Sequence, residues 1–464
     1  MTWFERLGGL DATFLYLEDR SAHMHVGSVC VFEGPAPGQE ELRDVIASRL
    51  HRVPRYRQRV LFPLLAAGRP VWVDDARFDL AYHVRRTALP APGGPEQLHQ
   101  LAGRLLAQRL DRDKPLWELW LAEGLEGGGF ALVAKTHHCM IDGLSGVDLA
   151  GALLDADPGA PRAPPPPWHP RPAPDPVTLA ARSLVDQARH PLDLVRGALD
   201  ETAATRQAVL ELAGGLVPLL GLSRMGRPPR CSLNQRIGPH RRLETVALEL
   251  AAVKRVRAAL GGTVNDVLLA VVTGGLRALL RARGEAPREE LRAMVPVSVR
   301  VEGARGTMGN QVTAVFCPLP VGEPDPVARL ARIARETRGL KEGRQAVGAL
   351  ALTRLGELAP PALAAQAARL EAVTGFMNVV VTNVPGPQFP LHLLGRRLLR
   401  WYPVVPLARL QTIGVAILSY DGGVGIGLLG DADRARDLPT LARALPAALD
   451  ELVAAAARAG GAGA

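Results

Sequence analysis

A proline-rich segment divides the chain into two stretches of similar character. Between residues 157 and 176 the composition shifts sharply, and Pro164 to Pro167 are four consecutive prolines. Such a segment has no core of its own and acts as a stiff linker. The chain has 464 residues, which is more than one core usually absorbs. We therefore predict a first domain over residues 1–156, a proline-rich and helical linker over 157–240, and a second domain over 241–464.

Strand-like and helix-like runs alternate on both sides of this linker. Apolar residues recur at helical spacing in long runs, such as Leu268, Val271, Val272, Leu276, Leu279 and Leu280. Strands covered by helices in each half indicate an α/β fold of two sandwich domains. Strands are predicted over 26–32, 78–86, 117–121, 130–135, 243–250, 294–300, 311–319, 378–382, 412–419 and 424–429, and the strand at 130–135 reaches 138 if the two histidines are extended. Helices are predicted over 39–51, 97–110, 144–154, 251–260, 263–283 and 438–457, with two or three more in 326–370 and a helical pattern in 177–222.

Composition limits the classes of partner. Hydrophobic residues at 47% and charged residues at 22% are typical of a globular protein. Only 4% of residues are aromatic, and no basic run is interleaved with aromatics, which argues against nucleic acid. The net charge of +9 favours acidic small molecules or an anionic membrane surface. No apolar run reaches the ~20 residues that cross a bilayer, so we expect any membrane contact to be peripheral. The basic segment 52–59 is interpreted as a solvated face, with an anionic ligand as the alternative.

Cysteine spacing and the N-terminus predict a cytoplasmic protein. The four cysteines are far apart and show neither metal-ligand nor disulfide spacing, so no metal site is expected; they are Cys30, Cys139, Cys231 and Cys317. This usage suits a reducing compartment. The first 19 residues contain Glu5, Asp11 and Glu18 and lack the apolar core of a signal peptide.

Two adjacent histidines stand where a strand-like run ends and a helix-like run begins. In an extended strand successive side chains point to opposite faces, so His137 and His138 must have different surroundings. An imidazole can accept a proton at neutral pH. No serine lies in a Gly-x-Ser-x-Gly elbow, Cys139 is adjacent rather than opposite, and neighbouring histidines suit one metal ion poorly. A general base acting directly on a substrate hydroxyl or amine remains, against the alternative of an inert hydrogen-bonded pair.

Residues near this pair have simpler interpretations. Asp142 either orients the imidazole or pairs with an arginine to hold the turn, and we favour the pairing. Gly143 supplies a backbone conformation that a Cβ would resist. His23 and His25 lack an aspartate at a supporting spacing, and we interpret them as ordinary polar residues.

The segment from His137 to Gly143 resembles the HHxxxDG motif of coenzyme-A-dependent acyltransferases and of peptide-synthetase condensation domains. Within that superfamily the chain resembles the bacterial wax ester synthase/diacylglycerol acyltransferases. The resemblance extends from about Leu7 to Gly430. It rests on residues 10–15 with 24–27, on Pro115-Leu116-Trp117, on Asn265-Asp266, and on 294–298, 309–311 and 382–387.

This resemblance implies two chloramphenicol-acetyltransferase-like domains with a channel between them. His138 would take a proton from diacylglycerol or a long-chain fatty alcohol, and the alkoxide would attack the acyl-CoA thioester without an acyl-enzyme. His137 would support the turn. Acyl-CoA would be a co-substrate, and no cofactor is implied. A lipid partner places the expected protein at the inner face of the cell membrane or at lipid droplets, whereas no oligomeric state follows.

Other motif residues have structural alternatives. Asn265 is our candidate donor to the oxyanion of the tetrahedral intermediate. Asp266 is a candidate substrate-binding residue, but Thr263 to Asp266 also forms a capping-box pattern that favours a structural role. The remaining candidates for substrate binding are Pro115, Leu116 and Trp117, as channel wall, and Thr382 and Asn383, for which core packing is equally compatible. Two alternatives to the acyl-CoA enzyme stay open: a condensation-type enzyme with a carrier-bound donor, and a catalytically silent lipid-surface protein.

Overall fold

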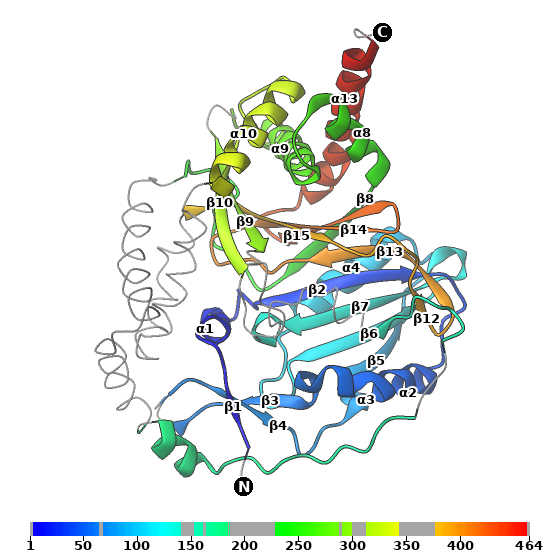
Figure 1. Cartoon of the computed structure of the whole chain (residues 1–464), viewed down its shortest axis with the longest axis vertical. Helices are drawn as coiled ribbons and strands as arrows, with labels where there is room; N and C mark the ends of the chain where they lie inside the picture. Colours follow the sequence, from blue (N-terminus) through cyan, green and yellow to red (C-terminus); the bar gives the residue numbers. More distant parts are fainter. Residues whose placement is uncertain are drawn as a thin grey trace.

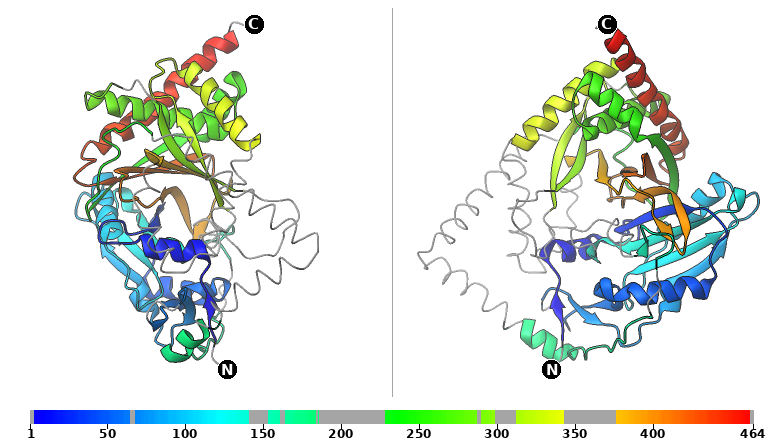
Figure 2. Two further views of the ribbon diagram at one scale, coloured as in Figure 1. Left: turned by 90° about the vertical axis from the view of Figure 1, so that its left-hand side faces the viewer. Right: turned by 45° about the vertical axis from the view of Figure 1, so that its right-hand side comes forward.

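The chain folds into two lobes, each built on a six-stranded sheet (Figure 1). The computed structural model describes residues 3–64, 68–140, 153–160, 164–183, 185, 228–286, 290–298, 312–342 and 376–461. The strand order is β12-β13-β2-β7-β6-β5 in the first lobe and β10-β9-β11-β14-β15-β8 in the second. The helices of the second lobe lie on the side of its sheet that faces away from the first lobe (Figures 1 and 2).

The first lobe is a mixed sheet with helices on both faces. Phe130 and Leu132 of β7 pack with Leu42 and Ile46 of α2, whereas the alternate side chains pack towards α4 and the second lobe. Its strands are β2 (His25–Phe32), β5 (Val84–Ala88), β6 (Trp117–Glu123), β7 (Phe130–His137), β12 (His392–Leu393) and β13 (Arg396–Val404). Its helices are α2 (Gln39–Arg49), α3 (Leu80–His83) and α4 (Pro95–Ala107). Short 3₁₀ turns lie at Leu50–Arg52, Pro54–Arg57, Glu126–Gly128 and His138–Met140.

A small third sheet extends the first lobe near the N-terminus. It has the order β1 (Glu5–Arg6), β4 (Val71–Asp74) and β3 (Gln58–Leu61). Helix α1 (Gly9–Leu17) follows β1 and contacts the turn at His138–Met140. A helix over residues 176–183 covers this sheet, because its Leu179 is buried with Val71 and Val73.

The second lobe has one large apolar core between its sheet and its helices. Every residue of the apolar stripe predicted for 263–283 is buried, since α9 (Val264–Ala282) packs against α8, α10 and α13. The strands are β8 (Arg241–Glu249), β9 (Leu291–Ser298), β10 (Val312–Leu319), β11 (Val379–Pro385), β14 (Ile413–Tyr420) and β15 (Gly423–Asp431). The other helices are α8 (Leu250–Leu260), α10 (Pro326–Glu342) and α13 (Leu438–Gly461).

Strand β13 connects the two lobes. It follows β11 of the second lobe in sequence but pairs with β2 of the first, from Leu398 opposite Phe32 to Val404 opposite Gly27. It also packs on β14 and β15. Glycine permits this approach, because a Cβ on Gly427 would lie 1.9 Å from the carbonyl oxygen of Pro403. The second half of the chain thus supplies a strand to the sheet of the first lobe, and this strand also packs on the second lobe.

Most predicted elements are present, with shifts at their ends. The strand predicted over 78–86 is wrong in its first part, because Asp79 caps the short helix α3 and the strand begins only at Val84. The strand predicted over 130–135 continues to His137. The helix predicted over 144–154 and most of the pattern in 177–222 lie outside the described residues, as does 343–370. Among the described helices none alone has the length and hydropathy to cross a bilayer; α8 and α9 do so only as a pair bent by 103°.

Candidate active site

His137 and His138 have different surroundings at the end of β7. The backbone N–H of His137 donates to the carbonyl of Leu116 at 2.9 Å, and that of His138 donates to the carbonyl of Met24 at 2.9 Å. The His138 ring stacks on Phe14 of α1, with ring centroids 3.8 Å apart and planes at 20°. Met24 has a φ of 49°, in the left-handed region that non-glycine residues rarely adopt. A constrained backbone therefore holds the turn that carries His138.

His137 lies in the protein interior and has a defined tautomer. Its Nδ1 accepts a hydrogen bond from the Cys139 N–H at 3.2 Å, so the ring proton is on Nε2. Burial, reinforced by the charge of Arg112, lowers the pKa of His137 to about 3. The ring is therefore neutral at physiological pH and supports the turn through Cys139.

His138 is also neutral at physiological pH. Burial lowers its pKa from 6.5 to about 4. Its Nδ1 is buried and has no hydrogen-bond partner in the described part of the chain. A neutral imidazole is the form that accepts a proton from a hydroxyl group, although this lowered pKa makes it a weaker base than free imidazole.

A buried carboxylate stands beside His137. Oε2 of Glu18 lies 3.8 Å from Nε2 of His137, and both side chains are 1% exposed. Arg112 donates to Glu18 from Nε at 2.8 Å and also from a terminal nitrogen, and Nε of Arg109 donates at 3.4 Å. These two arginines balance the charge of Glu18. The site around His137 is therefore a charged network inside the lobe.

His25 belongs to the same network, contrary to the prediction that it is an ordinary polar residue. It faces His137 across the β2–β7 ladder, with ring centroids 6.0 Å apart, and its Nε2 lies 3.9 Å from Glu18. His23 is also buried, and burial lowers its pKa to about 4. The prediction for His25 was wrong because the carboxylate near its ring is Glu18, which comes from the end of α1 and not from the same strand.

A buried lysine fixes the strand that leads to the histidines. Nζ of Lys135 donates to the carbonyls of Leu105 and Gln108 at the end of α4, at 3.0 Å each. The same nitrogen lies 3.2 Å from the carboxylate of Glu118. Lys135 and His137 share a face of β7, so the strand end is held against α4 immediately before the candidate base.

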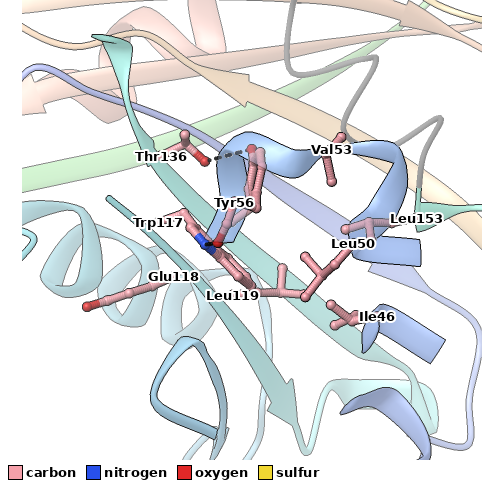
Figure 3. A pocket seen from close by; sticks show the side chains of 10 residues that line it. Ile46, Leu50, Val53, Tyr56, Trp117, Glu118, Leu119, Thr136 and Leu153 are labelled. Carbon is pink, nitrogen blue, oxygen red and sulfur yellow. Dashed lines mark hydrogen bonds between the residues drawn. The ribbon is translucent and has the colours of Figure 1, made fainter. Parts of the chain in front are cut away.

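The Pro115-Leu116-Trp117 motif forms a wall beside the histidine strand. All three residues are buried. The indole of Trp117 donates to the carbonyl of Tyr56 at 2.8 Å and stacks on His83 with centroids 4.5 Å apart. Figure 3 shows Trp117 and Tyr56 around a mostly apolar pocket, with the Tyr56 hydroxyl 3.4 Å from that of Thr136. The pocket is lined by Ile46, Leu50, Val53, Tyr56, Trp117, Glu118, Leu119, Ala134, Thr136 and Leu153.

The second lobe brings two asparagine candidates together. Nδ2 of Asn383, on β11, donates to Oδ1 of Asn265 in the first turn of α9 at 3.1 Å. Both residues are half-buried, as is Thr382. Because the side-chain carbonyl of Asn265 accepts this bond, the N–H donors of the Asn265 amide point away from Asn383. Sequence alone placed these residues in separate motifs, and the fold makes them a pair.

Asp266 has a structural role in the cap of α9. One carboxylate oxygen accepts from the N–H and hydroxyl of Thr263, both at 2.8 Å, and the other accepts from the Thr337 hydroxyl at 2.7 Å. The capping box predicted from the sequence is present. Both carboxylate oxygens of Asp266 thus have partners, and the residue is only 3% exposed. Neither feature suits the alternative role in substrate binding.

Some candidates fall outside these contacts. Asp142 and Gly143 lie outside the described residues. In the described part of the chain no group of three or more His, Cys, Asp or Glu side chains has the geometry to hold a metal ion. The cysteines in this part are free thiols. Burial raises the pKa of Cys139 well above its ordinary value, so this thiol is a poor nucleophile.

Solved structures with the same arrangement define the class of protein. The wax ester synthase/diacylglycerol acyltransferase of Marinobacter aquaeolei is 28% identical, with a TM-score of 0.69 over 97% of this chain and 100% of that one. The first condensation domain of the calcium-dependent antibiotic synthetase shares the fold at 18% identity, with a TM-score of 0.57 and 97% of each chain covered. The two-lobed fold is thus that of the chloramphenicol-acetyltransferase-like acyltransferases, as predicted.

Sequence comparison identifies the family within this class. Residues 7–268 match the wax ester synthase/diacylglycerol acyltransferase catalytic domain, and residues 308–453 match the C-terminal domain of that family. A Mycobacterium tuberculosis protein described as probable diacylglycerol O-acyltransferase tgs1 is 35% identical over 456 residues, which cover 96% of this chain and 95% of the relative. The chain belongs to the wax ester synthase/diacylglycerol acyltransferase family and is an acyltransferase.

Proposed function

We propose that the protein transfers a fatty acyl group from acyl-CoA to the hydroxyl of diacylglycerol, of a long-chain fatty alcohol, or of both. The observation that carries the proposal is the neutral His138 ring, held by Phe14 and Met24 at the end of β7 beside the supported His137. The description of the Mycobacterium tuberculosis relative supports diacylglycerol as an acceptor. That of the Marinobacter enzyme supports both products.

In the proposed reaction His138 acts as the general base. Its imidazole takes the proton of the acceptor hydroxyl as the oxygen attacks the thioester carbon. The tetrahedral intermediate collapses with cleavage of the C–S bond, and the imidazolium returns the proton to the coenzyme A thiolate. The products are one ester and one free coenzyme A, and no acyl-enzyme forms. The raised pKa of the neighbouring Cys139 thiol agrees with a route that uses no protein nucleophile.

Two further features support the acceptor geometry. The side chains around Trp117 and Thr136, two residues before His138, are mostly apolar, which is compatible with an alkyl chain alongside them. The donors of Asn265 suit an oxyanion in the second lobe, where Asn383 fixes the orientation of the amide. General base catalysis contributes roughly 10²–10⁴ in rate, and alignment of the two substrates supplies much of the remainder.

The proposed substrates also suggest a location. Diacylglycerol and long-chain alcohols reside in lipid phases, whereas acyl-CoA is dissolved in the cytoplasm. We therefore propose a cytoplasmic enzyme that associates peripherally with the inner face of the cell membrane or with lipid droplets.

The decisive experiment combines purified protein, labelled acyl-CoA and a panel of alcohols. Separation of products by class should show an ester and an equal amount of free coenzyme A without any carrier protein. His138→Ala should reduce kcat by at least about 10²-fold with unchanged circular dichroism, whereas replacement of the exposed His169 by alanine should have no effect. Ester formation at the wild-type rate in His138→Ala would refute the proposed mechanism.

A further inference from the structure

Exposed apolar side chains concentrate on the small three-stranded sheet. Among the described residues, the large hydrophobic side chains with high exposure are Phe62, Leu64, Val177, Val185, Phe389 and Leu399. Phe62 and Leu64, exposed by 40% and 49%, lie in the connection from β3 to β4. Val177, exposed by 69%, lies in the first turn of the helix over 176–183 that covers this sheet, and Val185, exposed by 47%, lies just after it. We call these four side chains the docking face.

The two halves of the docking face belong to one corner of the molecule. Leu179 of the helix is buried with Val71 and Val73 of β4, and Leu61 of β3 packs on the same cluster. Figure 1 shows the β3–β4 connection and the helix at the same end of the first lobe. Segments next to both pairs of exposed side chains, at Leu61 and at Leu179, thus pack on one small core, and burial of the exposed side chains against a partner would be favourable.

The surroundings of the docking face are strongly basic. Residues 3–8, 52–64, 68–79 and 164–185 contain nine arginines and five acidic residues, a net charge of +4 out of +9 for the whole chain. Asp74 and Asp75 are buried, as is Arg57 among the arginines, and Asp74 is bonded to Arg171. The exposed charge is therefore predominantly positive, which complements an anionic surface.

Aromatic rings accompany these arginines. The guanidinium of Arg171 lies 3.2 Å from the ring centroid of Trp3, and that of Arg57 lies 5.0 Å from that of Trp168. Arg182 lies 5.8 Å from the ring of Phe4. Side chains with an apolar stem or ring and a polar end are favoured where a bilayer meets water.

The docking face lies beside the active-site network. The guanidinium carbon of Arg112 is 5.9 Å from the ring centroid of Phe62, and the same side chain binds Glu18. Glu18 in turn faces His137. The Arg112 side chain would thus lie between a lipid at Phe62 and the network of Glu18 and His137.

We propose that the docking face binds an anionic phospholipid bilayer, with Phe62 and Leu64 inserted among the acyl chains and the surrounding arginines at the phosphates. The choice of a lipid partner rests on the proposed function, whereas the position of the surface rests on exposure and charge. Cationic and apolar groups together favour a bilayer over a purely aqueous anionic ligand. Docking here would deliver a membrane-dissolved acceptor next to the site.

Vesicle flotation of the full chain tests this surface. Wild type should float with vesicles of phosphatidylcholine and phosphatidylglycerol, and less so with phosphatidylcholine alone or at high salt. Phe62→Ser/Leu64→Ser and, independently, Val177→Ser/Val185→Ser should each lower the partition coefficient by about tenfold or more. The control Phe389→Ser/Leu399→Ser, with 50% and 41% exposure in the wild type, should bind as wild type.

The outcomes separate this proposal from the catalytic one. Acyl transfer to a long-chain alcohol dispersed in detergent, without a bilayer, should persist in the docking-face variants, so its absence in every protein would count against the proposed function alone. Equal flotation of wild type and both docking-face variants overturns the surface. An equal loss of flotation in the control Phe389→Ser/Leu399→Ser would overturn the proposed surface as well. A change of oligomeric state in the variants, with unchanged flotation, would overturn it in favour of self-association.

Discussion

The carboxylate of Glu18 and Nε2 of His137 lie 3.8 Å apart, with both side chains withdrawn from solvent. The proton on this nitrogen points to a negative charge because Nδ1 is occupied by the Cys139 N–H. Glu18 is itself held by Arg109 and Arg112. Glu18 is thus placed to position the His137 ring, and through it the turn that carries His138.

Replacement of Glu18 by glutamine should reduce kcat by roughly 10- to 100-fold, with a smaller change in KM. The neutral amide cannot balance the charge of Arg112, which weakens the interactions that hold the His137 ring by about 1–3 kcal/mol. If this loss is felt in the transition state, the rate falls by the stated range, because each 1.36 kcal/mol in a barrier is tenfold. Steady-state kinetics over a pH series would test this, because a positioning role predicts an altered acid limb as well as a lower rate. Glu123→Gln, which breaks an exposed pair with Arg86, is the control. Wild-type kinetics in Glu18→Gln would contradict the role.

Activity should be insensitive to pH near neutrality and should fall in acid. His138 must be neutral to act as a base, and its pKa is about 4. The rate with soluble substrates should therefore decline only as the pH approaches that value, not near 6.5. An acid limb with an apparent pKa near 6.5 in kcat/KM would show that the pKa of His138 is not lowered in the working enzyme.

Stability should decrease over a pH window set by the same rings. His23, His137 and His138 have folded-state pKa values of about 4, 3 and 4, below the unfolded value near 6.5. The unfolded chain therefore binds more protons below pH 6.5, and the stabilisation present above that pH is lost as the pH falls towards 4. Each ring contributes a slope of about 1.4 kcal/mol per pH unit. Urea titrations between pH 7 and pH 4.5 should show this decline, and a constant free energy of unfolding would contradict it.

The two asparagines of the second lobe should be energetically coupled. Asn265→Ala and Asn383→Ala should each lower kcat by about tenfold or more, and the double variant should lose less than the two effects combined. The reason is that Asn383 acts by orienting the Asn265 amide. A double-mutant cycle on kcat/KM measures the coupling. Additive losses would show that the pair does not act as a unit.

Gly427→Ala should destabilise the contact between the lobes. Its Cβ would approach the Pro403 carbonyl oxygen within 1.9 Å, and backbone on both sides leaves little room to relax. We expect a loss of at least about 1–3 kcal/mol in the free energy of unfolding. Gly339→Ala is the matched control, because Gly339 lies in α10 with open space around it and alanine there should stabilise by about 0.5–1 kcal/mol. Thermal denaturation of both variants would decide the comparison.

Much of the fold could be predicted because local periodicity is strong. The stripe of α9 and the alternation of β7 follow directly from apolar spacing, and the capping box at Thr263 is local in sequence. Strand β13 was not predicted, because its role depends on pairing with β2 across more than 360 residues and no local pattern encodes such a partner. Glu18 was noted only as a charge near the N-terminus for the same reason. The sequence predicted that His137 and His138 lie at the end of a strand. The roles of Asp142 and Gly143 stay predictions.

The late position of β13 in the chain has a consequence for biosynthesis. Until Val404 has left the ribosome, β2 has no partner on its β13 side, so the first lobe presents an open sheet edge during translation of most of the chain. Such an edge invites pairing with other chains. Completion of the first lobe therefore waits for the second half of the polypeptide, and a fragment ending in the proline-rich linker should aggregate where the full chain folds.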